Sequence, residues 1–141
     1  MGGQLESLNA TQPPDSLINP IRVGGEYARQ FGDTLYEPFV LRAQNLGYKI
    51  IIRLDGYKSR INKGFPYQNW TEWENYVKDR AQKYGLNVIY DVWNEPTPAG
   101  EFWSGTWEQY CEAYVRAYRT LVSVLGDSVK VSGPSTPIYN D

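Results

Sequence analysis

The sequence predicts an α/β fold, a partial TIM-type (β/α) barrel of about four βα units with parallel strands. Short β-branched runs alternate with longer amphipathic stretches, which is typical of parallel strands joined by right-handed helical crossovers. The loops after the expected strands are long and rich in polar and aromatic residues, as in barrels whose functional residues lie at the carboxyl ends of the strands. A doubly wound open sheet is the alternative, but the pair Gly24-Gly25 alone does not make a phosphate-binding loop.

The expected elements follow one another in a regular order. Strands are expected at four short apolar runs: residues 21–23, 49–54, 87–93 and 129–131. Helices are expected between them, over 35–46, from a capping box at Thr71 and Glu74 to Gly85, and from a second capping box at Thr106 and Gln109 to Gly126. Residues 1–19 are polar and turn-rich, and we interpret them as a leader or loop that precedes a domain over 20–141.

Composition narrows the chemistry that is available to this chain. It has 141 residues and a net charge of −2, which gives no reason to expect nucleic acid as a partner. No apolar run is long enough to span a membrane, so we expect no membrane partner. The sequence has no His and a single Cys, which removes Ser-His-Asp catalysis, most zinc sites and an internal disulfide. We therefore expect carboxylate chemistry without a metal or cofactor.

Residues 90–96, with the sequence YDVWNEP, are the most informative stretch. They predict a buried strand that places Asn94 and Glu95 next to each other at its carboxyl end, where Pro96 prevents further pairing. A carboxylic acid among aromatic residues at the mouth of a barrel suits a general acid, which donates a proton to a leaving oxygen. The neighbouring amide can hydrogen-bond a sugar hydroxyl. A pair that only ends the strand and caps the next loop is the structural alternative.

This motif resembles the fourth-strand signature of clan A glycoside hydrolases. Within that clan, residues 101–106 (EFWSGT), 108–110 (EQY) and 129–136 (VKVSGPST) are most similar to family 39, the family of β-xylosidases and α-iduronidases. The resemblance aligns the expected strands with the second to fifth strands of the barrel. It implies that 20–141 is part of a glycoside hydrolase catalytic barrel, which cleaves O-glycosyl bonds of an oligo- or polysaccharide with retention.

The resemblance also implies roles for individual residues. Glu95 corresponds to the catalytic acid/base, and Asn94 corresponds to the residue that contacts the sugar 2-hydroxyl. Arg22, at the end of the first expected strand, corresponds to the Arg that supports the nucleophile electrostatically. Trp103, in the loop after the same strand as Glu95, and Asp55, in the loop after the preceding strand, are further candidates for substrate binding.

The chain lacks a counterpart of the catalytic nucleophile, which the resemblance places on the seventh strand. Retaining hydrolysis needs two carboxyl groups, so we expect the 141-residue chain alone to be inactive. The missing half of the barrel is expected from a longer protein or from self-association, because the outer strands would otherwise have unpaired edges. The cellular location stays open, and a secreted parent protein is compatible with the sequence.

Two other classes of function stay open. The first is a carbohydrate-binding half-barrel that holds glycan on aromatic side chains without cleaving it, through Trp103, Trp107, Trp70 and Tyr57. The second is an acid/base isomerase or lyase, which would need a metal or phosphate site that the sequence does not show.

Overall fold

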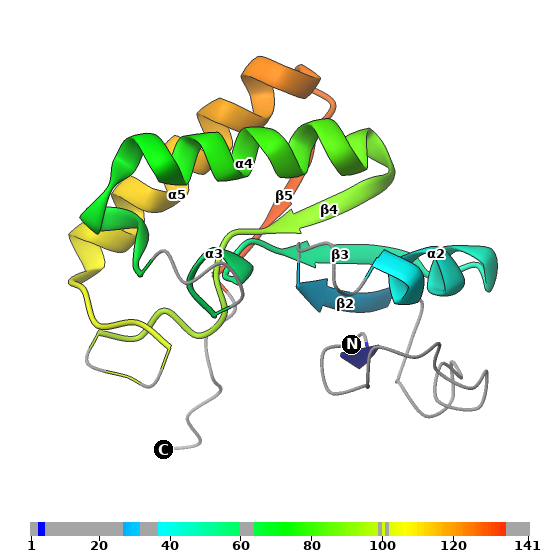
Figure 1. Cartoon of the computed structure of the whole chain (residues 1–141), viewed down its shortest axis with the longest axis horizontal. Helices are drawn as coiled ribbons and strands as arrows, with labels where there is room; N and C mark the ends of the chain where they lie inside the picture. The colour runs from blue at the N-terminus through cyan, green and yellow to red at the C-terminus, as the bar shows by residue number, and fades with distance from the viewer. Residues whose placement is uncertain are drawn as a thin grey trace.

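A parallel sheet with its strands in chain order forms the frame of the molecule (Figure 1). The computed structural model describes residues 3–4, 27–31, 37–59, 64–98, 100 and 102–134. In this part of the chain the sheet has five strands: β1 (Gly3–Gln4), β2 (Tyr27–Phe31), β3 (Lys49–Arg53), β4 (Val88–Asp91) and β5 (Lys130–Ser132). All neighbouring pairs are parallel.

Helices connect these strands. The longer ones are α2 (Glu37–Asn45), α4 (Trp70–Tyr84) and α5 (Trp107–Leu125), and the shorter ones are α3 (Gly56–Ser59), η3 (Pro66–Gln68) and η4 (Gly85–Asn87). Sequential parallel strands that alternate with helices form the α/β arrangement of a partial (β/α) barrel, so the predicted fold class is confirmed. Among the described helices, none has both the length and the apolar character needed to cross a lipid bilayer.

The carboxyl ends of the strands lie in register. Phe31 pairs with Arg53, Arg53 with Asp91, and Asp91 with Ser132. The N–H of Leu54 donates to the carbonyl oxygen of Asp91 at 2.9 Å, which extends the pairing of β3 and β4 by one residue. Because all strands run in the same direction, the loops that follow them leave the sheet at one edge, which is the edge that carries the active site in a barrel.

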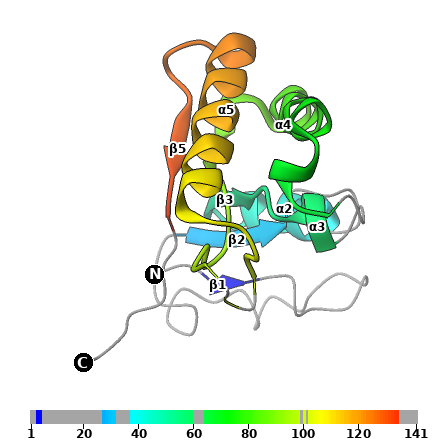
Figure 2. The ribbon, with the colours of Figure 1, turned by 90° about the vertical axis from the view of Figure 1, so that its left-hand side faces the viewer.

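Helices α4 and α5 pack against each other over the sheet (Figure 2). Trp73 of α4 is fully buried between them, and its Nε1–H donates to the carbonyl oxygen of Ala113 on α5 at 3.0 Å. In β3, Ile50 and Ile52 are buried whereas Ile51 is partly exposed. The helices therefore cover one face of the described sheet more fully than the other.

The start of the chain departs from the sequence prediction. The strand predicted at 21–23 lies outside the described residues, and β2 is found at Tyr27–Phe31. This segment contains Arg29 and Gln30 and has no apolar run, so its pairing with β3 and β1 decides its conformation rather than its own propensity. Strand β1, at Gly3–Gln4, lies within the segment that we interpreted as a leader or loop.

Helix ends follow the predictions in α5 and differ in α4. Thr106 Oγ1 accepts from the Gln109 N–H and Gln109 Oε1 accepts from the Thr106 N–H, which confirms the second capping box. The first predicted box, at Thr71 and Glu74, is wrong, because Asn69 is the N-cap and its side chain accepts from the Glu72 N–H at 3.1 Å. Asn is among the strongest N-cap residues and starts the helix earlier.

Candidate active site

Glu95 and Asn94 lie together just beyond the end of β4. Glu95 is four positions past Asp91, the last residue of that strand, and its side chain is partly exposed. Asn94 is 8% exposed and takes part in an isolated β-bridge. Glu95 has a φ of 45°, whereas the other described residues with positive φ are glycines. A residue with a Cβ is strained in this left-handed region, and such strain gathers at sites where function constrains the backbone.

The loop after Glu95 is held by its own hydrogen bonds. The Thr97 N–H donates to the Glu95 carbonyl oxygen at 2.8 Å, and the Gly100 N–H donates to the Thr97 carbonyl oxygen at 2.9 Å. At the two ends of the loop, Nε1–H of Trp93 donates to the carbonyl oxygen of Phe102 at 2.9 Å. The conformation of Glu95 is therefore set inside a closed loop.

An aromatic cluster supports this loop. Trp93 and Trp103 are buried, with ring centroids 5.3 Å apart and planes at 80°. Phe65, from the segment before η3, packs 6.1 Å from Trp93 and 5.6 Å from Trp103. Trp73 of α4 lies 6.0 Å from Trp93. Such aromatic pairs contribute about 0.5–1.5 kcal/mol each beyond the area they bury, so the cluster joins the loop after β3 firmly to the loop after β4.

A hydroxyl pair and one glycine bring the same two loops together at the surface. Tyr67 Oη and Ser104 Oγ are 2.8 Å apart and share a hydrogen bond. Beside them, a Cβ on Gly105 would lie 2.7 Å from Tyr67 Cε1 and 3.0 Å from Trp103 Nε1. Only glycine fits this close approach without displacing an aromatic ring.

A buried ion pair stands at the end of the neighbouring strand. Arg53, the last residue of β3, is 3% exposed, and Asp55 is 6% exposed. Nε of Arg53 donates to Oδ1 of Asp55 at 3.2 Å, and its NH2 nitrogen donates to Oδ2 at 2.5 Å. Two hydrogen bonds from one guanidinium hold this buried carboxylate in a fixed orientation.

Asp91 lies among tyrosines of α5 at the base of the site. Asp91 is 1% exposed, and a Cβ on Gly133 would lie 3.3 Å from its Oδ1 and 3.7 Å from the Tyr110 hydroxyl. Burial raises the pKa of Tyr110, and the charge of Asp91 raises it further. The pKa of Tyr114 is raised by the same two causes in the same order. Both phenols therefore stay protonated at neutral pH.

The structure brings together some of the predicted site residues. Glu95, Asn94 and Asp55 lie at the carboxyl edge of β3 and β4, whereas Arg22 falls outside the described residues. Trp103 has 0% exposure, and its Nε1–H donates to the Thr106 carbonyl oxygen at 3.1 Å, so its ring packs in the interior and is not open for stacking on a sugar.

Two features of the candidate site were not predicted from the sequence. Asp91 was within the YDVWNEP motif, and a carboxylate inside an apolar strand was the signal that could have found it. The pairing of Tyr67 with Ser104 joins residues 37 positions apart and has no sequence signal.

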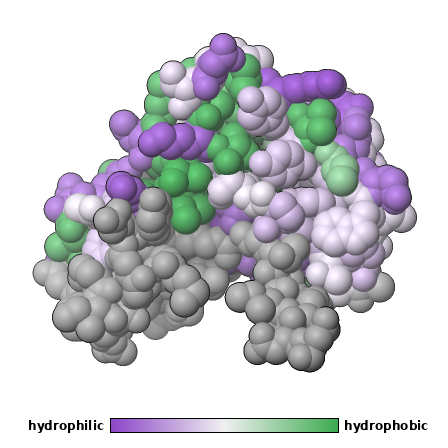
Figure 3. Space-filling model, turned by 180° about the vertical axis from the view of Figure 1, so that it is seen from behind, coloured by the Kyte–Doolittle hydropathy of each residue, from purple (hydrophilic) through white to green (hydrophobic). Residues whose placement is uncertain are grey.

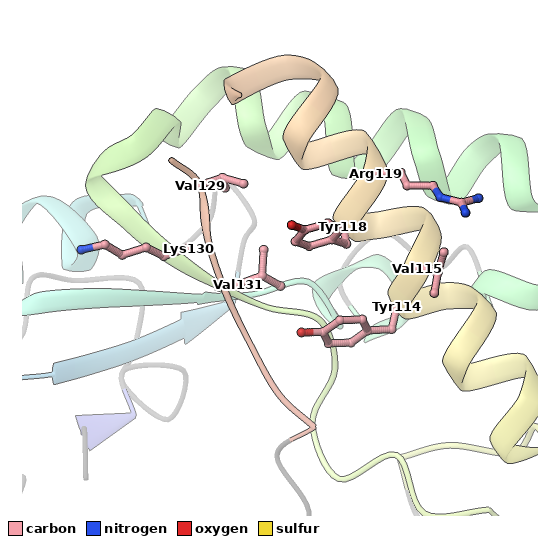
Figure 4. A pocket seen from close by; sticks show the side chains of 7 residues that line it. All are labelled: Tyr114, Val115, Tyr118, Arg119, Val129, Lys130 and Val131. Carbon is pink, nitrogen blue, oxygen red and sulfur yellow. The ribbon is translucent and has the colours of Figure 1, made fainter. Parts of the chain in front are cut away.

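A groove lies elsewhere on the molecule. A groove of about 610 Å³ runs between α5 and β5 (Figure 4), where Figure 3 shows hydrophobic side chains gathered on the rear face. None of the predicted site residues that the structure describes contributes to it. Its lining consists of Tyr114, Val115, Tyr118, Arg119, Val129, Lys130 and Val131.

In the described part of the chain, no group of three or more His, Cys, Asp or Glu side chains could hold a metal ion.

The fold and the similarity to known families place this chain in the class of clan A glycoside hydrolases on a (β/α) barrel. The family model described as Cellulase (glycosyl hydrolase family 5) matches residues 27–123, more than half of the chain, and the match includes Asn94 and Glu95. The chain therefore belongs to glycosyl hydrolase family 5. The more specific resemblance to family 39 is not confirmed by this match.

One curated relative is a beta-xylosidase from Caldicellulosiruptor saccharolyticus. It is 32% identical to this chain over an alignment of 87 residues, and the alignment covers 58% of this chain and 18% of the relative. This chain therefore spans about a fifth of the length of the relative that it matches.

Proposed function

We propose that this chain forms part of the catalytic domain of a retaining glycoside hydrolase in which Glu95 is the general acid/base. The observation that carries the proposal is the strained, loop-bound position of Glu95 at the carboxyl edge of the sheet. In the first step Glu95 would donate its proton to the glycosidic oxygen while the nucleophile forms a glycosyl-enzyme. In the second step the Glu95 carboxylate would take a proton from the water that releases the sugar.

The neighbouring residues have supporting roles in this proposal. Asn94 would hydrogen-bond the sugar 2-hydroxyl, an interaction that strengthens in the transition state. The Arg53–Asp55 pair would border the sugar at the adjacent strand end, because the pair is rigid and lies on the same edge. Arg22 would support the nucleophile, and Trp103 would shape the site from behind.

A second carboxylate is needed on the opposite side of the sugar, about 5–5.5 Å from the acid. We propose that it comes from further βα units, because a complete barrel has eight and the described sheet has five strands. The apolar groove beside β5 supports this view, because it lies where the helix of a following βα unit would pack. Without such units, the 141-residue chain is expected to be inactive.

The first substrate class to test is β-linked xylosides. The beta-xylosidase relative and the resemblance of residues 129–136 to family 39 both favour it.

A chimera provides the test. Residues 27–134 of this chain replace the corresponding βα units of the C. saccharolyticus beta-xylosidase, whose remaining chain would supply the nucleophile. The chimera should hydrolyse aryl β-xylosides, and Glu95→Gln should lower kcat by about 10²–10⁴-fold. The loss should be smaller for a dinitrophenyl leaving group, which needs little protonation, and Glu95→Ala should be rescued by azide, which attacks the glycosyl-enzyme without a base.

The matched control is Glu108→Gln, an exposed carboxylate at the start of α5. It should leave kcat unchanged. If the chimera is active and Glu95→Gln has no more effect than Glu108→Gln, the acid/base role is wrong.

An alternative function is glycan binding without cleavage, and the exposed ring of Trp107 favours it, because this ring is 43% exposed. Titration of the 141-residue chain with xylo-oligosaccharides distinguishes the two proposals. Binding that Trp107→Ala abolishes and Glu95→Gln leaves intact would support the alternative.

A further inference from the structure

The indole of Trp93 closes the loop that carries Glu95. Its Nε1–H donates to the carbonyl oxygen of Phe102 at 2.9 Å, so a side chain just before the site binds the main chain at the far end of the loop. Between these two points, the Thr97 amide closes a short turn that begins at Glu95, and the Gly100 amide closes a second turn that begins at Thr97. The described residues of this loop thus lie between two points of the chain that one side-chain hydrogen bond joins.

Packing holds the ring of Trp93 in place. The side chain is 1% exposed, and its neighbours Trp103, Trp73 and Phe65 lie at centroid distances of 5.3, 6.0 and 6.1 Å. A buried indole N–H needs an acceptor, and leaving it without one is unfavourable. The fixed ring therefore fixes the position of the Phe102 carbonyl, and with it the end of the loop.

The backbone of Glu95 needs such a constraint. A residue with a Cβ stays at a φ of 45° only when the surrounding structure over-determines its conformation. We infer that Trp93 is a positioning residue: its indole N–H holds the loop closed and thereby keeps Glu95 in the left-handed conformation that directs its carboxyl group. This inference deepens the proposed function, on which it rests for the catalytic meaning of Glu95.

The test replaces Trp93 in the full chain by 3-benzothienylalanine, which keeps the bicyclic shape and has sulfur in place of the N–H. The amides of Thr97 and Gly100 should then exchange with solvent at least about tenfold faster, since losing a hydrogen bond worth about 1.4 kcal/mol changes an equilibrium tenfold. The Cα and Cβ chemical shifts of Glu95, which report on its φ, should move toward extended values.

The matched control is the same replacement at Trp73. Its Nε1–H also makes a buried hydrogen bond, of 3.0 Å to the Ala113 carbonyl oxygen, but that bond joins α4 to α5, and the replacement keeps the bicyclic ring that packs against Trp93. The Trp73 variant should leave the Thr97 and Gly100 amides and the Glu95 shifts unchanged. Unchanged exchange in the Trp93 variant, or equal acceleration in both variants, would overturn the inference.

A measurement on the unmodified chain keeps the inference testable if the Trp93 variant does not fold. The indole N–H of Trp93 and the amides of Thr97 and Gly100 should exchange through one opening, with equal protection, and the indole N–H of Trp73 should differ. Distinct openings for Trp93 and the two amides would contradict the inference. These readouts concern the loop alone, so they can fail while the acid/base role of Glu95 stands, and the reverse also holds.

Discussion

The backbone conformation of Glu95 can be tested through stability. The comparison is between Glu95→Gly and Glu95→Ala, which both remove the carboxylate and differ only in Cβ. A left-handed conformation costs a residue with a Cβ about 1–2 kcal/mol, whereas glycine loses about 0.4–1 kcal/mol through its greater freedom in the unfolded chain. Glu95→Gly should therefore be more stable than Glu95→Ala by about 0.5–1 kcal/mol, or about 2–4 °C in melting temperature for a chain of this size.

Urea denaturation followed by tryptophan fluorescence measures this difference. The same pair of substitutions at Lys78, an exposed position inside α4, is the control. There Gly should be less stable than Ala by about 1 kcal/mol, because glycine is unfavourable in a helix. The two sites should therefore give differences of opposite sign. A Glu95→Gly variant that is less stable than Glu95→Ala would show that the left-handed conformation is not enforced.

Three further outcomes are expected. Gly105→Ala should lower the free energy of unfolding by about 1–3 kcal/mol in urea denaturation, because its Cβ would lie 2.7 Å from Tyr67 Cε1. A double-mutant cycle of Tyr67→Phe and Ser104→Ala should give a coupling of about 0.5–1 kcal/mol, and additive effects would show that their 2.8 Å hydrogen bond contributes nothing. Burial raises the pKa of Tyr90 and Tyr110 in the folded chain, so the unfolded chain loses these protons first, at about pH 10. The free energy of unfolding should keep its full contribution from these phenols below that pH, and above it should fall by up to about 1.4 kcal/mol per pH unit for each phenol. In urea denaturation at several pH values, Tyr110→Phe should remove the part of this pH dependence that Tyr110 contributes.

The fold could be predicted from sequence where local signals and the sheet agree. The Ile50–Ile52 run is apolar, β-branched and too short for a helix, and it became β3. The capping pair at Thr106 and Gln109 placed the start of α5 correctly. Strand β2 could not be predicted in this way, since its residues are polar and its conformation depends on pairing with partners on both sides.

The site was only partly predictable for a related reason. Asn94 and Glu95 are adjacent in sequence, so the motif and the end of a strand were enough to place them together. The fixed position of Trp103 in the interior depends on contacts with Phe65 and Tyr67, which follow a different strand. An aromatic residue in a loop can stack on a sugar or pack in the core, and the local sequence is the same in both cases. Only its partners in space decide between the two.

The side chains that support the loop of Glu95 lie close to it in the sequence. The groups that hold its loop come from the segment between Phe65 and Trp103, through the aromatic cluster and the bond from Trp93. The described lining of the groove between α5 and β5 includes none of these residues. In the proposed mechanism, a separate set of βα units can therefore supply the nucleophile without changing the loop that carries Glu95. The chimera must therefore pack correctly at both of its junctions, at β2 and along β5 and α5. An inactive but well-folded chimera would count against the proposed catalytic role of this segment.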